Sequence, residues 1–441
     1  MTRNTDLSMK QIFNLNFGFF GVQIAYALQS ANISRIFATL GADPHQLSFF
    51  WILPPLMGML VQPLVGKYSD RTWCRLGRRK PYLLGGAIVA VLVMMMLPNA
   101  GSINFGSRLF LGLNGAMWFG LFSLIFLDTS INVAMQPFKM MVGDMVGDNQ
   151  KAKGYSVQSF LCNAGSLVGY LFPIFFTWIG LANTAPAGMI PQSVRWSFYI
   201  GALILILCVL YTFFNVQEMP PKEYAEFHGI TEGADAKEDN ASLIQLLRKA
   251  PRTFWDVSLV QFFCWAAFLF LWTYTNGAIA GNCWHSSDVA SSEYQAAGNW
   301  VGVLFAVEAV GAMLWALVIP KFKTLKRAYV VSLLLGAAGF LSVFFLHDQW
   351  LLFGSFLLIG VVWAAMLAIP FTFVTNALTD HIGTYLGLFN CSICLPQIIA
   401  AACGGALLRL IGGSQAAMFI IAAALLVCGA ACVGFIKDKN N

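Results

Sequence analysis

Charged residues are scarce in this chain, and their scarcity excludes most classes of soluble protein. Of 441 residues only 10% are charged, whereas 58% are hydrophobic. Because a soluble domain has roughly a quarter of its residues charged, this composition predicts an integral membrane protein. The apolar runs are longer than barrel strands and do not alternate, which predicts helical spans. The net charge of +6 does not indicate a nucleic-acid partner, because the basic residues follow the pattern of membrane topology.

The chain also lacks the residue groupings that catalysis, metal binding or a disulfide framework would need. Cys391 and Cys394 have a metal-like spacing, but they lie in an apolar segment without a second pair or a nearby histidine. His45, His285 and His347 fall at predicted turns, and no phosphate-binding glycine loop is present. We therefore expect no enzyme, no cofactor and no metal site.

Long apolar segments predict an all-α membrane protein with twelve transmembrane helices. They cover approximately residues 11–34, 46–66, 82–98, 109–136, 154–179, 196–215, 257–280, 298–319, 328–346, 350–370, 385–410 and 415–435. The one long polar stretch divides them into six and six. It predicts an N-terminal lobe at 1–216, a cytoplasmic linker at 217–254 and a C-terminal lobe at 255–441.

The distribution of lysine and arginine predicts the orientation. With both termini in the cytoplasm, 22 of the 26 basic residues fall in cytoplasmic segments. The other four, which are Arg35, Arg108, Arg195 and Arg409, fall at the outer ends of helices. We therefore expect a multi-pass protein of the cell membrane with cytoplasmic termini, in contact with the lipid bilayer and monomeric.

The densest basic segment is a hairpin between the second and third spans. Its motif residues are Gly66, Asp70, Arg71, Gly77, Arg78 and Arg79. We expect Gly66 to allow two helices to approach closely and the arginines to hold the loop at anionic headgroups. Asp70 is the acidic residue of the hairpin, so it is the candidate for a gating contact. The alternative is a topological anchor without a gating role.

Two acidic residues, Asp128 and Glu308, lie deep inside predicted helices. Desolvation favours the neutral form of an unpaired carboxyl group, so such a group is suited to proton coupling. Asp128, Asn132 and Gln136 are spaced i, i+4 and i+8, which places their hydrogen-bonding groups on one stripe of a helix. Glu308 could share the proton, contact sugar, pair with an outer arginine, or have a structural role only.

Aromatic and amide side chains of the second half form a candidate sugar platform. Trp265, Trp272 and Asn276 share one helical face, and aromatic rings stack on sugars while amides bind their hydroxyl groups. Ordinary helix packing is the alternative.

The hairpin resembles the loop between helices 2 and 3 of major facilitator transporters. Its lengthened form, together with the Leu127-Asp128 to Asp144 segment, is similar to the sucrose/proton symporter branch of the glycoside–pentoside–hexuronide transporters. Segments that end at Gln23, Gln29, Asn390 and Gln397 also match this branch.

The resemblance implies the major facilitator fold and a proton-coupled symporter that imports a disaccharide or related glycoside, such as sucrose or maltose, by alternating access. It implies Asp128 as the proton site, with Glu308 as a second candidate from burial alone. The substrate-binding candidates are Gln23, Gln29, Asn132, Gln136, Trp272, Asn276, Asn390 and Gln397. The alternative that stays open is a sodium-coupled or passive carrier of another polar solute, with Asp128 binding sodium.

Overall fold

The computed structural model describes residues 6–103, 109–147, 150–227, 243–377 and 382–436, and no strand is present among them. The N-terminal helices are α1 (Met9–Thr39), α2 (Pro44–Phe50), α3 (Leu53–Arg71), α4 (Lys80–Met96), α5 (Gly115–Met145), α6 (Lys151–Trp178) and α7 (Gln192–Asn215). Two short helices follow, α8 (Pro221–Phe227) and α9 (Leu243–Lys249). The C-terminal helices are α10 (Arg252–Trp284), α11 (Ser292–Ala316), α12 (Leu325–Phe345), α13 (Leu352–Ala377), α14 (Ile382–Leu410) and α15 (Met418–Cys432).

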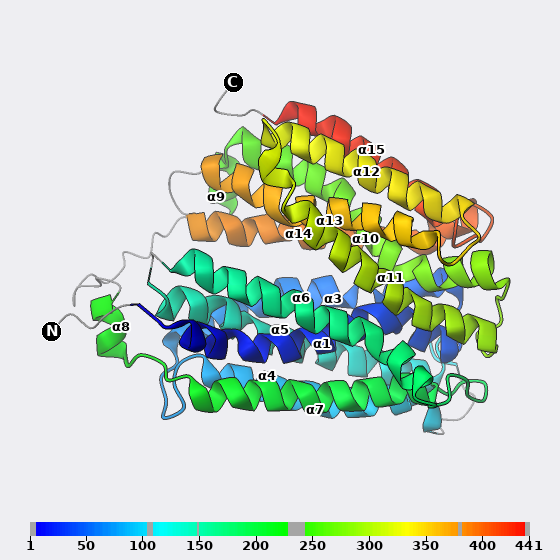
Figure 1. Ribbon diagram of the computed structural model, residues 1–441, viewed down its shortest axis with the longest axis horizontal. Coiled ribbons are helices and arrows are strands. Elements are labelled where there is room, and N and C mark those ends of the chain that lie inside the picture. The colour runs from blue at the N-terminus through cyan, green and yellow to red at the C-terminus, as the bar shows by residue number, and fades with distance from the viewer. Residues whose placement is uncertain (1–5, 104–108, 148–149, 228–242, 378–381, 437–441) are drawn as a thin grey trace.

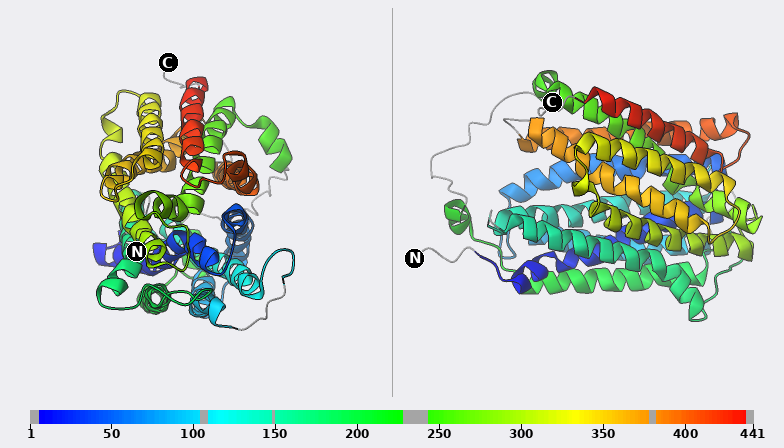
Figure 2. Two further views of the ribbon diagram at one scale, coloured as in Figure 1. Left: turned by 90° about the vertical axis from the view of Figure 1, so that its right-hand side faces the viewer. Right: turned by 45° about the horizontal axis from the view of Figure 1, so that its top comes forward.

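The long helices form two six-helix lobes, with α2 and α3 counted as one span (Figures 1 and 2). In the N-terminal lobe α1 packs against α6 and α7, and α4 packs against α5. In the C-terminal lobe α13 packs against α11 and α12, and α15 packs against α10 and α12. Both α8 and α9 lie at one end of the bundle, which we call the linker end, and the opposite end is called the distal end (Figure 1).

The described helices match the predicted number of spans, but one of them is unusually polar. Eleven spans are long and apolar enough to cross a membrane, and α1 is the remaining long helix. Several of its polar side chains form hydrogen bonds with neighbouring helices. Asn16 accepts a hydrogen bond from Gln158 at 3.0 Å, and Asn14 accepts one from Tyr211 at 2.9 Å. Inside a bilayer such pairs replace water as hydrogen-bonding partners, so a polar helix can be buried in the lobe.

Two of the predicted helices differ from the structure in a way that matters for the site. The second span is not one helix, because it is interrupted at Trp51 and Ile52, and α3 begins at Leu53 with Pro54 and Pro55 in its first turn. The fourth span runs on through Pro137 to Met145, so Lys139 and Asp144 lie in α5 and not in a loop. The predicted end at Gln136 was therefore too early, because a proline inside a membrane helix need not end it.

Glycine allows close helix approach where the lobes meet and where Glu308 is held. A Cβ atom at Gly302 of α11 would collide with the backbone oxygen of Tyr170 in α6. A Cβ atom at Gly360 of α13 would collide with the backbone oxygen of Glu308. Small residues at such crossings let membrane helices pack backbone against backbone.

Candidate functional site

Asp128 lies in the middle of α5, and its side chain is 3% exposed. The side-chain amide of Gln29 in α1 donates a hydrogen bond to its Oδ1 atom. The Oδ2 atom has no hydrogen-bond partner, and no lysine or arginine of the described residues forms an ion pair with this carboxylate. The structure therefore brings two predicted site residues together and leaves one carboxylate oxygen available for a proton, a cation or a ligand hydroxyl group.

The predicted stripe on α5 continues from Asp128 through two further amides. Asn132 donates a hydrogen bond to the backbone oxygen of Asp128 at 2.8 Å and accepts one from Gln62 of α3 at 2.7 Å. Gln136 is partly buried, and its Oε1 atom has no hydrogen-bond partner. Sequence reasoning missed Gln62, although it lies in the apolar segment directly before the basic hairpin, where an amide is unexpected.

Glu308 belongs to the other lobe, on α11, and its side chain is 7% exposed. Its electrostatic neighbour is Tyr170 of α6, whose ring contacts that of Phe305 at 5.6 Å between centroids. Arg35, one of the outer arginines, does not pair with Glu308, because its guanidinium is bonded to amide oxygens instead. Glu308 is thus buried close to the contact between the lobes.

The predicted aromatic platform is part of a larger cluster that includes both lobes. Trp272 of α10 lies with its ring centroid 6.4 Å from that of Trp265 and 6.0 Å from that of Trp363 in α13. Trp51, from the N-terminal lobe, stacks on Trp272 at 6.1 Å. Asn276, one helical turn along from Trp272, is 3% exposed, and neither amide atom of its side chain has a hydrogen-bond partner. Trp51 and Trp363 were not predicted, because their proximity depends on helix packing.

The remaining substrate candidates are not joined to Asp128 by a hydrogen bond. Gln23 is buried on α1, where its Cβ atom packs against Gly165 of α6. On α14, Gln397 donates to the backbone oxygen of Ile393 at 2.9 Å, and Asn390 donates to the sulfur of Cys394 at 3.8 Å. The amides of these last two residues are therefore used within their own helix.

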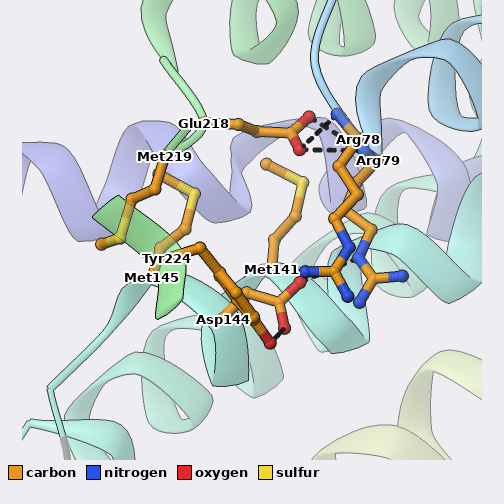
Figure 3. A pocket seen from close by; sticks show the side chains of 8 residues that line it. All are labelled: Arg78, Arg79, Met141, Asp144, Met145, Glu218, Met219 and Tyr224. Atoms are coloured by element: carbon orange, nitrogen blue, oxygen red, sulfur yellow. Dashed lines mark hydrogen bonds and ion pairs between the residues drawn. The ribbon is translucent and has the colours of Figure 1, made fainter. Parts of the chain in front are cut away.

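The basic hairpin lies at the linker end, where it is held by an acidic residue that follows α7. The carboxylate of Glu218 accepts hydrogen bonds from the backbone N–H groups of Arg78, Arg79 and Lys80 at 2.8–3.0 Å. Figure 3 shows Glu218 together with Arg78 and Arg79. The three N–H groups lie at the N-terminus of α4, where backbone N–H groups lack partners in the helix and attract negative charge. Gly77 has φ +110°, and a Cβ atom there would lie 2.7 Å from Glu218 Oε1.

Arg78 and Arg79 of the hairpin make further contacts (Figure 3). Arg79 is 2% exposed and forms an ion pair with Asp144 of α5 at 2.8 Å. The guanidinium of Arg78 lies over the ring of Tyr224 at 4.4 Å, and the hydroxyl group of Tyr224 donates to Asp144 at 3.4 Å. Glu218 and Asp144 are therefore acidic partners of the hairpin that the sequence did not reveal.

The expectations for Gly66 and Asp70 both stay predictions. Among the described residues, a Cβ atom at Gly66 would meet Met140 at an ordinary distance of 4.0 Å, which by itself shows no close helix approach at this position. The side chains of Asp70 and Arg71 lie outside the described residues, so the gating role of Asp70 stays a prediction.

Comparisons with known proteins agree with this architecture. The sucrose transport protein SUT5 of Oryza sativa subsp. indica is 24% identical over 439 residues, which cover 87% of this chain and 79% of the relative. The sucrose transport protein SUC4 of Arabidopsis thaliana is 23% identical over 437 residues, covering 92% of this chain and 85% of the relative.

Solved structures show the same fold. The nucleoside transporter NupG superposes with a TM-score of 0.70 at 13% identity, covering 98% of this chain and 100% of that chain. A D-xylose–proton symporter superposes with a TM-score of 0.68 at 14% identity, covering 98% of this chain and 97% of that chain.

The family model described as MFS/sugar transport protein matches residues 18–382, which is most of the chain. The expected resemblance is confirmed: the chain belongs to the MFS/sugar transport protein family and is a multi-pass membrane transporter of sugar, not an enzyme.

Proposed function

We propose that the protein is a proton-coupled symporter that imports a disaccharide or related glycoside, such as sucrose or maltose, by alternating access. The observation that carries this proposal is the environment of Asp128, which is buried and bonded to a neutral amide, with one oxygen unpartnered. Uptake of a proton changes the charge of such a carboxyl group, and in alternating access this change occurs inside a protein whose two lobes move relative to each other. Intramembrane acids in this setting are candidates for coupling sites by default.

The polar stripe that contains Asp128 and the aromatic cluster of the other lobe support a hydroxyl-rich substrate. Asn132, Gln136 and Gln62 supply amide donors and acceptors on the N-terminal lobe, and Trp272 supplies an aromatic face on the other lobe. Sugar sites commonly combine these two types of group, because ring C–H surfaces stack on aromatic rings while hydroxyl groups bind amides. The names of the two plant relatives, both sucrose transport proteins, support the same substrate class.

The proposal includes an orientation. The hairpin, α8 and α9 lie at the linker end, and we place this end in the cytoplasm. We also place the protein in the plasma membrane, as a monomer. The observation that supports the orientation is that 22 of 26 basic residues fall in segments assigned to the cytoplasmic side. The proposed lobe boundaries are those of the sequence analysis, 1–216 and 255–441 with a linker at 217–254.

The first test is accumulation of labelled sucrose and maltose in sealed vesicles under an imposed pH gradient. We expect uptake above the external concentration, which collapses when the gradient is removed by a protonophore. Sodium dependence at fixed pH, without an effect of the proton gradient, would instead favour the cation-coupled carrier. Equilibration without accumulation under either gradient would favour a passive carrier.

The second test isolates Asp128. Asp128→Asn removes the change of charge but keeps the size of the side chain and a hydrogen-bonding amide. We expect loss of accumulation driven by the pH gradient, with retained exchange of labelled for unlabelled sugar. Asp288→Asn, on an exposed loop, makes the same chemical change and should behave as the wild type. Glu308→Gln is the companion variant: loss of driven uptake in this variant would place part of the coupling on α11. An Asp128→Asn protein that still concentrates sugar would refute the assignment.

A further inference from the structure

Arg35 is a buried cation that connects the two lobes. The sequence places it at the outer end of the first span, but α1 continues to Thr39 and the side chain is only 1% exposed. Its Nε atom donates to Gln295 Oε1 at 2.7 Å, and one terminal nitrogen donates to Asn299 Oδ1 at 2.8 Å, both on α11. The other terminal nitrogen donates to Asn183 Oδ1 at 2.9 Å, in the segment between α6 and α7.

The amides that accept these bonds are themselves held in place. Asn299 donates to the hydroxyl group of Thr177 in α6 at 2.7 Å. Gln295 donates to the backbone oxygen of Val289 at 2.7 Å. Asn183 also accepts a bond from Ser193 at 2.7 Å. The guanidinium therefore lies among neutral acceptors that other bonds hold in place. Two of its three hydrogen bonds connect α1 with α11 of the other lobe.

The residue before Arg35 makes a second connection between the lobes. Ser34 accepts a hydrogen bond from Trp51 Nε1 at 2.8 Å and donates one to the backbone oxygen of Trp272 in α10 at 3.1 Å. The rings of Trp51 and Trp272 stack on each other. Two consecutive residues of α1 thus bind α10 and α11, and both contacts belong to the distal half of the bundle.

We propose that Arg35 is the distal gate residue of the transport cycle, and that its bonds to Gln295 and Asn299 hold the distal-closed state. Alternating access requires the lobes to part at the distal end. Parting removes the two α11 acceptors from the guanidinium, whereas Asn183 moves with the N-terminal lobe and stays bound. The proposal rests on the lobe movement of the proposed function but not on the identity of the sugar or of the coupled ion.

The neutral acceptors explain how such a contact can be both specific and reversible. A hydrogen bond from a charged donor is stronger than one between neutral groups. A buried ion pair, in contrast, leaves two uncompensated charges when it breaks. With amides as acceptors, opening exposes a single cation, and water solvates this cation readily. The closed state is therefore favoured, but the free energy needed to open it stays small enough for the transport cycle.

Accessibility of a cysteine at Ser48 tests this role. Ser48 is fully buried, and its Cβ and Oγ atoms lie 2.9 and 3.2 Å from where a Cβ atom of Gly404 in α14 would be. Ser48→Cys is therefore shielded by the opposite lobe. In nanodiscs, which expose both ends, Arg35→Gln removes the charged hydrogen bonds to Gln295 and Asn299. We expect it to raise the rate of maleimide labelling at Ser48→Cys at least about tenfold, the factor that corresponds to a single charged hydrogen bond. The ten native cysteines supply the baseline, measured without Ser48→Cys.

A second variant keeps the charge and separates the gate from a folding defect. A Cβ atom at Gly298 would lie 2.6 Å from Cδ and Nε of Arg35, so Gly298→Ala displaces the guanidinium and should also raise labelling. Two control variants should not change labelling. Gly281→Ala places its Cβ atom in open space. Arg195→Gln removes a cation at the start of α7 whose side chain has no described partner. Wild-type labelling rates in both Arg35→Gln and Gly298→Ala would overturn the proposal, as would an equal rise in Arg195→Gln. Because no substrate is present, failure of this test is independent of the proton and sugar assignments.

Discussion

Glu218 offers the sharpest test of how the basic hairpin is held. Its carboxylate accepts backbone hydrogen bonds from three consecutive residues, Arg78, Arg79 and Lys80, at the start of α4. Glu218→Gln keeps the length of the side chain and one acceptor oxygen but removes the negative charge. The variant therefore loses the charge-assisted part of the cap and its favourable interaction with the helix dipole.

The size of the effect follows from the type of contact. Charge-assisted hydrogen bonds contribute about 1.5–3 kcal/mol, helix caps about 1 kcal/mol and dipole interactions about 0.3–1 kcal/mol. Glu218 is partly exposed, so solvent screening reduces these values. We expect Glu218→Gln to lower the free energy of unfolding of the N-terminal lobe by about 1–2 kcal/mol, and Glu218→Ala by somewhat more. For a unit of this size the shift in melting temperature is about 2–8 °C.

The assay is thermal unfolding of the purified protein in one detergent, followed by tryptophan fluorescence. Glu226→Gln is the matched control, because Glu226 is an exposed acid on α8, eight residues after Glu218, and loses the same charge. Gly77→Ala should also destabilise the protein, because its backbone is left-handed and its Cβ atom would meet Glu218. If Glu218→Gln melts at the temperature of Glu226→Gln, the carboxylate does not hold the hairpin and the argument from its three contacts is wrong.

Two further predictions concern the substrate and the orientation. Trp272→Ala should raise the sugar concentration for half-maximal uptake about tenfold, whereas Trp196→Ala, at an exposed position on α7, should leave it unchanged; equal values in the two variants would exclude stacking on Trp272. Cysteines introduced at Pro186 and Ser291 should react with an impermeant reagent in intact cells, and one at Gly233 should react only after permeabilisation; the reverse pattern would invert the proposed orientation.

The helices could be predicted from the sequence because the bilayer sets a simple requirement for length and apolarity. Two of the errors in the helix boundaries occurred where proline was involved. Pro54 and Pro55 follow a break that divides the second span, whereas Pro137 is accommodated inside α5. A single sequence does not distinguish these cases, because the neighbouring helices decide whether the backbone groups freed by proline find other partners.

The sequence predicted which residues belong to the candidate site better than it predicted the contacts between them. An acid inside an apolar helix marks Asp128 in the sequence alone, and the polarity of α1 marks Gln29 as a residue without access to lipid. That these two are bonded to each other depends on packing between segments 99 residues apart. The contact of Glu218 with the hairpin, across 138–140 residues, depends on how the chain returns to the linker end after α7. No local pattern contains that information.

The proposed roles of Asp128 and Arg35 both involve α1. Gln29, which is bonded to Asp128, and Arg35, which is bonded to α11, are six residues apart, or about 9 Å along the helix axis. Six residues also rotate the side-chain direction by about 240°, so the two residues face different neighbours, α5 within the lobe and α11 across it. Helices move largely as rigid units, so a displacement of α1 at Gln29 when Asp128 gains or loses a proton is also a displacement at Arg35. The chain thus places the partner of the proposed coupling group and the proposed gate on two faces of one helix, about 120° apart, which is a short physical route from protonation to opening.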